Sequence, residues 1–406
     1  MRVLFLHQTF PSRNEEGSGR PYDFARQLVK DGHEVTIVAA AFSYLTGSAF
    51  AHARGLVQRE VHPEGFMVLR TWTIPGYHAG YIRRVISLAS YMATSFLVAL
   101  FAGKYDVIVA GSPPITVAMV GGLVARLKRT RFVLEIRDLW FDVAVELGIV
   151  KNRFLVAFLR WWERSLERGA AAIVINSPGF FPHLERNGVP RERITLVPNG
   201  VDTALFRPDA DITGLRAERG LTGKFVTVYA GSLGVANDID TILNTAELLR
   251  GDPAFVFLLI GDGNRRQQLQ ADAERRGLTS VTFTGPVPKQ DVPRYLCAAD
   301  VSVCTLLDTP LFRTVYPNKI FDAMACGRPV VTLVDGVIRQ VVEESGAGIF
   351  VHPSDAAGLA AALQRLKASP EEAKAMGQRG RAAIEAKFDR WNCARLMSDT
   401  LKRVTA

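Results

Sequence analysis

The stretch FVTVYAGSLGVANDIDTILNTAELL, residues 225–249, decides the fold class. It opens with a largely apolar run, Phe225–Ala230, which is typical of a strand buried in a parallel sheet. A turn with two glycines follows at 231–234, and apolar residues then recur at helical spacing. A strand, a glycine turn and a helix form a common phosphate-binding arrangement. The stretch therefore predicts an α/β unit with a ligand site at Gly231, Ser232 and Leu233, although the turn alone is equally compatible with a plain tight connection.

Buried-strand patterns alternate with helical patterns on both sides of this stretch. The first series of expected strands is Val3–Leu6, Val35–Ala40, Val107–Ala110, Phe132–Glu135, Ala172–Ile175 and Ile194–Val197. The second series is Phe225–Ala230, Phe255–Ile260, Val281–Phe283, Val301–Cys304, Val330–Leu333 and Gly348–Val351. Apolar runs separated by helices indicate parallel sheets covered on both faces. We expect two doubly wound α/β domains, at 1–202 and 223–385, joined by a linker at 203–222 that is rich in proline, glycine and charge.

A second glycine pair stands where another strand of the second series ends. Gly261 and Gly263 flank an aspartate directly after the apolar run 255–260. Ligands of open α/β sheets bind at the carboxyl ends of the strands. Two glycine turns at one such edge favour a ligand over two unrelated tight turns.

The strongest motif reads YPNKIFDAMACGRPVV, residues 316–331. Tyr316, Pro317 and Asn318 precede a helical pattern, and proline is favoured at a helix start. Lys319 and Asp322 are three residues apart, so both project from one face of the first turns. A lysine beside free backbone N–H groups suits a diphosphate, and a carboxylate one turn later can accept two ribose hydroxyls. The alternative is a local surface ion pair between these two side chains.

A further glycine loop, Gly17-Ser18-Gly19, lies between the first strand and the first helical pattern. Glycines there would let the backbone approach a ligand, and a helix N-terminus favours an anion. The loop is not GxGxxG, so a plain flexible loop is an equal alternative.

The net charge of +9 is concentrated in the first half of the chain. Residues 1–200 hold 24 Lys and Arg against 16 Asp and Glu, whereas the remainder holds 25 against 24. This asymmetry indicates an anionic partner, or else ordinary solvated surface charge. The uncharged segment Val85–Ala102 lies between Arg83-Arg84 and Lys104, and it reads as a packed helix, a membrane-docking helix or, least well, a membrane span. Four cysteines without metal-type spacing indicate buried thiols in a reducing compartment, and the N-terminus lacks the apolar core of a secretory signal.

With these motifs in order, the chain resembles the family-4 glycosyltransferases of the GT-B fold, and most of all the bacterial exopolysaccharide and O-antigen members of the fucosamine-transferase and colanic-acid type. The similarity extends along essentially the whole chain. The residues that carry it are the glycine loop, Gly32–Val35, Ser112–Pro114, Glu135–Trp140, Val197–Asp202, Gly231–Gly234, Gly261–Gly263, Phe283–Gly285 and Asp322–Val331.

The resemblance implies two Rossmann-like domains facing each other across a cleft, with a C-terminal helix at 386–406 that crosses back to the first domain. It implies retaining transfer from a nucleotide-diphospho-sugar, with the donor held by the second domain and the acceptor by the first. It also implies UDP as the nucleotide, with base contacts near Val287, and no metal, since basic side chains and helix N-termini take the role of a cation in this fold. Arg137 and Asp138, at the end of a strand of the first domain, are the candidates for positioning acceptor or donor phosphate; a structural Arg–Asp pair is the alternative.

The chain departs from the family pattern at several positions. Of the two glutamates spaced eight apart in many members, the later matches Asp322 and the earlier Thr314. The arginine and lysine common near the second domain's glycine turn are absent, and Lys319, Arg313 and Arg265 are the expected substitutes.

The expected partners are a nucleotide-sugar, a lipid-linked saccharide acceptor and an anionic membrane surface. The chain would then act in the cytoplasm, held peripherally on the inner face of the cytoplasmic membrane. A nucleotide-sugar 2-epimerase of the same fold and a catalytically idle scaffold remain alternatives. A nucleic-acid-binding protein is supported only by the net charge, and no binding motif for it is present.

Overall fold

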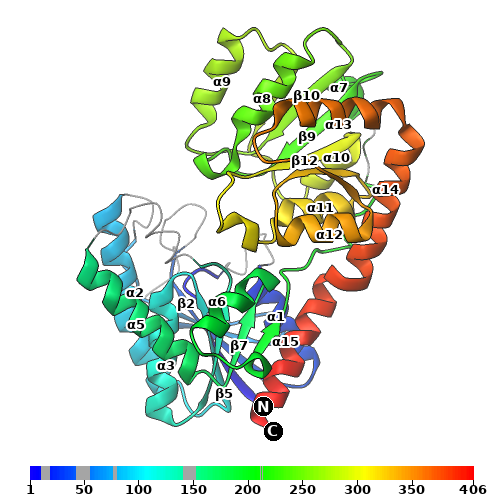
Figure 1. Ribbon diagram of the computed structural model, residues 1–406. Coiled ribbons are helices and arrows are strands. Elements are labelled where there is room, and N and C mark those ends of the chain that lie inside the picture. Colours follow the sequence, from blue (N-terminus) through cyan, green and yellow to red (C-terminus); the bar gives the residue numbers. More distant parts are fainter. Residues whose placement is uncertain (11–18, 43–54, 76–79, 140–151, 211, 213) are drawn as a thin grey trace. The chain divides into compact units, whose positions relative to one another are not determined.

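The computed structural model describes residues 1–406 apart from 11–18, 43–54, 76–79, 140–151, 211 and 213. The chain divides into two compact units, Met1–Pro198 with Cys393–Ala406, and Asn199–Asn392. Each unit is built on one sheet with helices on both faces, as Figure 1 shows. The prediction of two Rossmann-like α/β domains is confirmed.

The sheet of the first unit has the strand order β3-β4-β2-β1-β5-β6-β7-β8 within the described residues. All neighbouring strands pair in parallel except β3 and β4. The strands are β1 Arg2–Leu6, β2 Glu34–Ala40, β3 Val57–Val61, β4 Met67–Thr71, β5 Val107–Ser112, β6 Arg131–Ile136, β7 Ala172–Ile175 and β8 Ile194–Leu196. The helices are α1 Arg20–Lys30, α2 Tyr81–Phe101, α3 Ile115–Lys128, α5 Arg153–Gly169, α6 Phe181–Arg186 and α15 Arg390–Thr405.

The C-terminal helix α15 belongs to the core of this first unit. Met397 and Leu401 are fully buried in one cluster with α1 and with strands β1, β2 and β5. The carboxylate of Asp31, at the end of α1, accepts hydrogen bonds from Ser398 Oγ at 2.5 Å and Lys402 Nζ at 3.0 Å. The chain therefore returns to its first unit after completing the second.

The sheet of the second unit is parallel, with the order β11-β10-β9-β12-β13-β14. Its strands are β9 Phe225–Ala230, β10 Phe255–Ile260, β11 Val281–Gly285, β12 Val301–Thr305, β13 Val330–Leu333 and β14 Gly348–Phe350. Its helices are α7 Leu215–Glu218, α8 Ile239–Leu248, α9 Arg266–Arg275, α10 Val292–Ala298, α11 Asn318–Ala325, α12 Val337–Ser345, α13 Ala356–Ala368 and α14 Pro370–Ala383. Two apolar clusters, one on each face, bury the sheet. Phe206 and Leu221, from the 203–222 connection, lie in one of them.

Segment 85–102, for which three interpretations were open, forms most of helix α2. Tyr91 and Ala99 are fully buried, whereas Phe101 is 79% exposed. The helix is long and apolar enough to cross a membrane. Of its most apolar stretch, 28% is buried inside the protein, so most of that stretch is at least partly exposed. It therefore presents one packed face and one exposed apolar face.

All four cysteines lie among the described residues as buried free thiols. This agrees with the expectation of reduced side chains.

Candidate functional site

In the second unit, backbone hydrogen bonds join the loops that follow β9 and β10 to the end of β11. Gly231 N donates to Ile260 O at 2.9 Å, and Leu233 N donates to Asp262 O at 2.9 Å. Gly261 N donates to Gly285 O at 3.0 Å. The carboxyl ends of three adjacent strands are therefore fixed to one another and form one continuous edge.

The glycines at 261 and 263 are required by this contact between loops. A Cβ at Gly261 would lie 1.9 Å from Gly231 O, and one at Gly263 would lie 2.5 Å from the carbonyl carbon of Leu233. Real side chains never approach backbone so closely. These two glycines therefore allow the turn 231–234 to pack directly against the loop that follows β10.

Lys319, in the first turn of α11, lies directly behind that turn. Its Nζ donates to Tyr229 Oη at 2.7 Å and to Asn237 Oδ1 at 2.9 Å, and Tyr229 Oη donates in turn to Ser232 O at 2.8 Å. A Cβ at Gly231 would be 3.3 Å from Nζ, so the absence of a side chain at Gly231 keeps the ammonium group close to the loop. Burial lowers the pKa of Lys319.

Among the described residues, no carboxylate neutralises Lys319. Its contacts are a phenol and an amide, and Asp322, one turn later, forms no ion pair with it. The local Lys319–Asp322 pair, the alternative left open by the sequence, is therefore not formed. The amide nitrogens of Ser232 and Gly234 also donate no hydrogen bond within the described part of the chain. A half-buried cation beside free N–H groups is a site for an anion.

Asp322 is half-buried, and no described residue donates a hydrogen bond to its carboxyl group. Burial raises its pKa to about 7, against the opposing positive charges of Lys289 and Arg390. Such a carboxyl group is available to accept hydroxyl donors from a ligand. The motif residues around it have structural roles too: Pro317 caps α11, Asn318 accepts from Asn199 Nδ2 at 2.9 Å, and Tyr316 packs edge-on against Phe321.

The two arginines expected to replace the missing cations are each bound to an aspartate. Arg265 donates to both carboxylate oxygens of Asp240, at 2.5 and 3.1 Å. Arg313 contacts Asp308 through three hydrogen bonds of 2.9–3.0 Å. Their charge is already compensated, so of the three expected substitutes Lys319 alone has no acidic partner within the part of the chain that the structure describes.

Arg266 is a cation that the sequence reasoning missed. Its guanidinium lies 3.2 Å from where a Cβ of Gly285 would stand, and its buried Nε has no hydrogen-bond partner among the described residues. Its nearest carboxylate is Asp262, at 3.8 Å. The signal available in the sequence was its place directly after a glycine turn, at the start of a helix. Val287, the expected base contact, lies two residues beyond Gly285 and is partly buried against the core of this unit.

In the first unit, a group of buried polar side chains gathers at the carboxyl ends of β1, β5 and β6. Arg20 donates from Nε to Glu135 Oε1 at 2.5 Å and from Nη1 to Pro198 O at 2.5 Å. Burial alone would raise the pKa of Glu135, but the charges of Arg20 and Arg137 outweigh it and lower that pKa. Glu135 is therefore ionised and holds Arg20 in place. The buried Nη2 of Arg20 has no hydrogen-bond partner among the described residues.

His7, at the end of β1, faces the same group. Its Nδ1 lies 2.7 Å from Thr9 O, a carbonyl that can only accept, so Nδ1 carries the proton and Nε2 has a free lone pair. Burial and the charge of Arg137 lower its pKa to about 4. The buried Nε2 has no partner in the described ranges, which makes neutral His7 a hydrogen-bond acceptor for a ligand.

Arg137 and Asp138 follow β6, as predicted, but they do not form an ion pair with each other. Arg137 Nη2 donates to Pro113 O at 2.7 Å, and its buried Nε has no partner among the described residues. Burial raises the pKa of Asp138, against a hydrogen bond from Leu139 N and the charge of Arg137. The structural Arg–Asp pair is thus absent, and both side chains remain available for a ligand.

Of the predicted N-terminal loop, Gly17 and Ser18 lie outside the described residues. Gly19 is exposed and precedes α1, where its carbonyl accepts from Tyr22 N at 2.8 Å. Neither His7 nor Arg20 was predicted as a site residue, although each stands beside a predicted motif.

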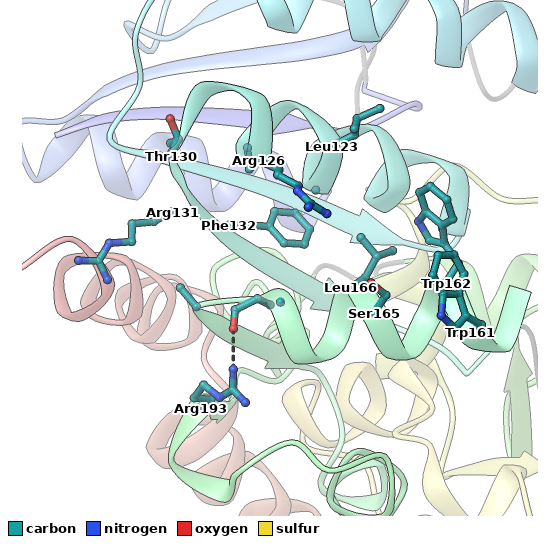
Figure 2. A pocket seen from close by; sticks show the side chains of 15 residues that line it. Leu123, Arg126, Thr130, Arg131, Phe132, Trp161, Trp162, Ser165, Leu166 and Arg193 are labelled. Atoms are coloured by element: carbon teal, nitrogen blue, oxygen red, sulfur yellow. Dashed lines mark hydrogen bonds between the residues drawn. The ribbon is translucent and has the colours of Figure 1, made fainter.

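A pocket of about 610 Å³ lies at the opposite edge of the first sheet (Figure 2). Arg131 and Phe132, which begin β6, line it together with Trp161, Trp162 and Leu123 from α5 and α3. Because this is the amino edge, the pocket is separate from the polar group around Glu135.

Two known families match the chain, one over each unit. Residues 20–200 match the glycosyl transferase 4-like domain, and residues 224–369 match glycosyl transferases group 1. The two matches cover both units, and each unit has the Rossmann-like sheet of the GT-B fold. The chain therefore belongs to this class of glycosyltransferases.

Individual relatives support the class. The chain is 26% identical over 362 residues to the putative colanic acid biosynthesis glycosyl transferase WcaI of Escherichia coli K12, covering 85% of this chain and 86% of the relative. It is 31% identical over 201 residues to a GDP-mannose-dependent phosphatidylinositol monomannoside mannosyltransferase of Mycolicibacterium smegmatis, covering 47% of this chain and 52% of that one. Among solved structures, HepE of Anabaena in complex with UDP has the same fold, with a TM-score of 0.74 at 21% identity, over 99% of this chain and 100% of HepE.

Proposed function

We propose that this enzyme is a retaining glycosyltransferase that moves a hexosyl or N-acetylhexosaminyl group from a UDP-sugar to a polyprenyl-diphosphate-linked saccharide. The observation that carries the proposal is Lys319, a half-buried cation beside the turn 231–234 that has no carboxylate partner in the described ranges of the chain. One helical turn away stands Asp322, whose carboxyl group accepts no hydrogen bond from the described residues.

The chemistry asks for positive charge at this place. As the glycosidic bond breaks, negative charge grows on the departing diphosphate. Lys319, the N–H groups at the start of α11 and the amides of Ser232 and Gly234 would oppose it, a contribution typically worth about 3 kcal/mol per preorganised donor. Asp322 would accept the ribose hydroxyls. In the first unit, Arg137, Asp138 and neutral His7 would position the acceptor hydroxyl or the donor phosphate.

UDP is the proposed nucleotide. HepE, of the same fold, has been solved with UDP and with UDP-glucose, while the mycobacterial relative uses GDP-mannose. A thermal-shift series with UDP, GDP, ADP and their sugars separates the possibilities, because a ligand that binds only the folded state raises the Tm. We expect the largest rise with UDP; a larger rise with GDP would overturn this choice.

Retention and metal independence are part of the proposal. Transfer from an α-linked donor should give an α-linked product, read by the anomeric proton coupling in NMR. The rate should be unchanged in a short assay with EDTA, since basic side chains take the role of a cation. A β-linked product would contradict retention, and free sugar released without any acceptor would indicate the 2-epimerase instead.

The acceptor is assigned from the relatives and from the surface of the first unit. The Escherichia coli relative is named for colanic acid biosynthesis. Helix α2 exposes Ile82, Leu97 and Phe101, and α5 exposes Phe154 and Trp161. With the basic excess of residues 1–200, these side chains would place the first unit on the anionic inner face of the cytoplasmic membrane, where a lipid-linked sugar is reached.

A further inference from the structure

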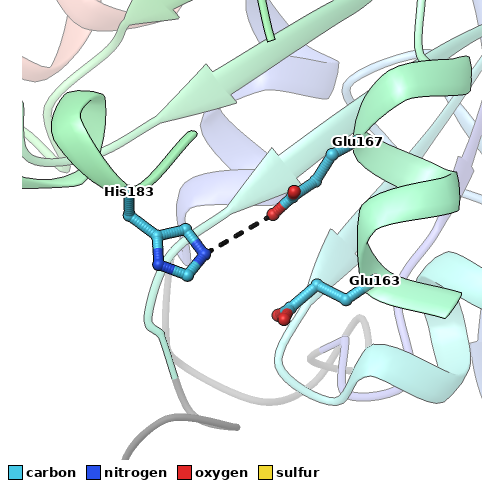
Figure 3. Close-up of side chains that lie close together, drawn as sticks. All are labelled: Glu163, Glu167 and His183. Atoms are coloured by element: carbon cyan, nitrogen blue, oxygen red, sulfur yellow. Dashed lines mark ion pairs between the residues drawn. The ribbon is translucent and has the colours of Figure 1, made fainter. Parts of the chain in front are cut away.

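Two neighbouring helices of the first unit bring three potential metal ligands together. Glu163 and Glu167 lie one turn apart on α5, and His183 lies on α6. Their ligand atoms are all within 4.8 Å of one another. Figure 3 shows the two carboxyl groups and the imidazole pointing toward one another.

Glu167 is the unusual member, because it is fully buried with little to compensate its charge. Its Oε2 accepts one hydrogen bond, from Asn187 Nδ2 at 2.9 Å. Its Oε1 is buried and accepts none from the described residues. Among those residues no lysine or arginine forms an ion pair with it, and the nearest basic atom is His183 Nε2, at 3.7 Å. A buried carboxylate in this state is costly unless a cation balances it.

The hydrogen bonds indicate that His183 does not supply that positive charge. A carboxylate can only accept, so the amide of Asn187 must turn its NH₂ group toward Glu167. The same nitrogen lies 3.1 Å from His183 Nε2. Nε2 must then be an acceptor, and the imidazole is neutral. Two carboxylates and one imidazole, all electron-pair donors, therefore converge at this place.

We propose that Glu163, Glu167 and His183 bind a divalent transition-metal ion, for which Zn²⁺ is the probe. Imidazole and carboxylate are zinc ligands, at distances of about 2.0–2.2 Å, and small side-chain rotations would close the present spacing. Asn187 would keep its hydrogen bond to Glu167 and orient that ligand, as outer partners of metal ligands do. The ion would fasten α6 to α5 within the first unit. This site is independent of the proposed sugar transfer.

Calorimetric titration of the tag-free, EDTA-treated protein with Zn²⁺ tests the site without any activity assay. We expect one equivalent to bind to the wild type, and Glu163→Gln and His183→Gln to weaken binding at least about tenfold. Glu185→Gln is the matched control, because it removes an exposed carboxylate of α6 that pairs with Arg191 outside the cluster. Absence of stoichiometric binding, or equal affinity in all these variants, would overturn the proposal.

Thermal unfolding gives a second readout, which includes the buried ligand. Zn²⁺ at about a hundredfold excess over its Kd should raise the Tm of the wild type by on the order of 5 °C. Glu167→Gln should lose this rise, yet in EDTA it should melt no lower than the wild type, since it removes an unbalanced charge. The opposite result would be a lower Tm of Glu167→Gln in EDTA and no effect of Zn²⁺ on the wild type. It would mean that protonated His183 forms an ion pair with Glu167, and it would overturn the metal site.

Discussion

Asp322 is half-buried in α11, and burial raises its pKa to about 7 from an ordinary value near 4. Between these two values the folded protein binds more protons than the unfolded chain. The free energy of unfolding therefore falls as pH rises through this window. Ionisation of Asp322 therefore destabilises the ligand-free protein, and hydroxyl donors of a bound ligand would offset this destabilisation.

Replacing Asp322 with asparagine should consequently stabilise the ligand-free protein at pH 8. At pH 4 the effect should be small, because the folded wild type then carries a protonated, neutral Asp322 and the asparagine of the variant is neutral too. The same variant should bind UDP more weakly at pH 8, because it loses the charged acceptor. Melting curves at the two pH values and a UDP titration measure both effects. A variant that is less stable than the wild type at pH 8 would mean that Asp322 supports the fold rather than a ligand.

How much of the site could be predicted differs from residue to residue. Lys319 and Asp322 were predicted because a proline-initiated helix fixes their spacing on one face. His7, Arg20 and Arg266 were missed, because their importance comes from burial and unmet hydrogen bonds that only tertiary contacts create. The binding of Arg265 and Arg313 to aspartates was likewise not predictable. Asp240 lies on α8, 25 residues from Arg265, and the contact of Arg313 with Asp308 depends on the local conformation of the segment that contains both.

Among the secondary-structure elements, the buried parallel strands were predictable because helices cover both faces of each sheet. Side chains on either face of such a strand are therefore apolar, which gives a continuous apolar run. Strands β3 and β4 were missed for physical reasons. In β3 every residue is exposed or half-buried, and it pairs antiparallel at the sheet edge. In β4 Arg70 is 1% exposed, held by Phe10 O at 2.7 Å and by Glu60. Neither gives the continuous apolar run by which the other strands were recognised.

The contact between the β9 and β10 loops makes a prediction about Gly261. Its φ is +134°, and a Cβ would overlap the Gly231 carbonyl. Gly261→Ala should destabilise the protein by about 2 kcal/mol or more, since backbone strain and overpacking add. Gly251→Ala is the control, because nothing lies within 4 Å of its Cβ position, and its effect should stay within about 0.5 kcal/mol. Equal stability of the two variants by urea unfolding would show that the loops do not meet as described.

Helix α2 makes a prediction about membranes. Flotation with phosphatidylglycerol vesicles at low salt should carry the protein upward, and high salt should release it. Because each basic residue near an anionic surface contributes about 1 kcal/mol, Arg83→Glu with Arg84→Glu should reduce binding at least about tenfold. Phe101→Ser should weaken it further by removing an exposed apolar side chain.

The control reverses two exposed charges of the second unit, Lys374→Glu with Lys387→Glu. It keeps the same change in net charge and should leave flotation intact. If both double variants lose binding equally, attraction is due to overall charge, and α2 is only a helix of the domain core.

For the whole molecule, the proposed roles of the two units rest on the side chains at the carboxyl edge of each sheet. The second unit offers an ammonium group and two backbone amides that the described residues leave without an anionic partner or acceptor, and such groups suit a diphosphate. The first offers the neutral side chain of His7 and the buried guanidinium of Arg20 held by Glu135, which suit a polar group of a ligand that must be oriented. In this proposal Lys319 contacts the donor diphosphate.

Calorimetric titration of UDP into the wild type and into Lys319→Met tests that claim most directly. The loss of a charged hydrogen bond worth about 1.5–3 kcal/mol should raise the Kd about 10- to 150-fold. Lys367→Met, which removes a lysine paired with Asp252, should leave the Kd unchanged. A Tm of Lys319→Met close to that of the wild type would show that the turn 231–234 is intact. An unchanged Kd in that folded variant would contradict the account and place the diphosphate elsewhere.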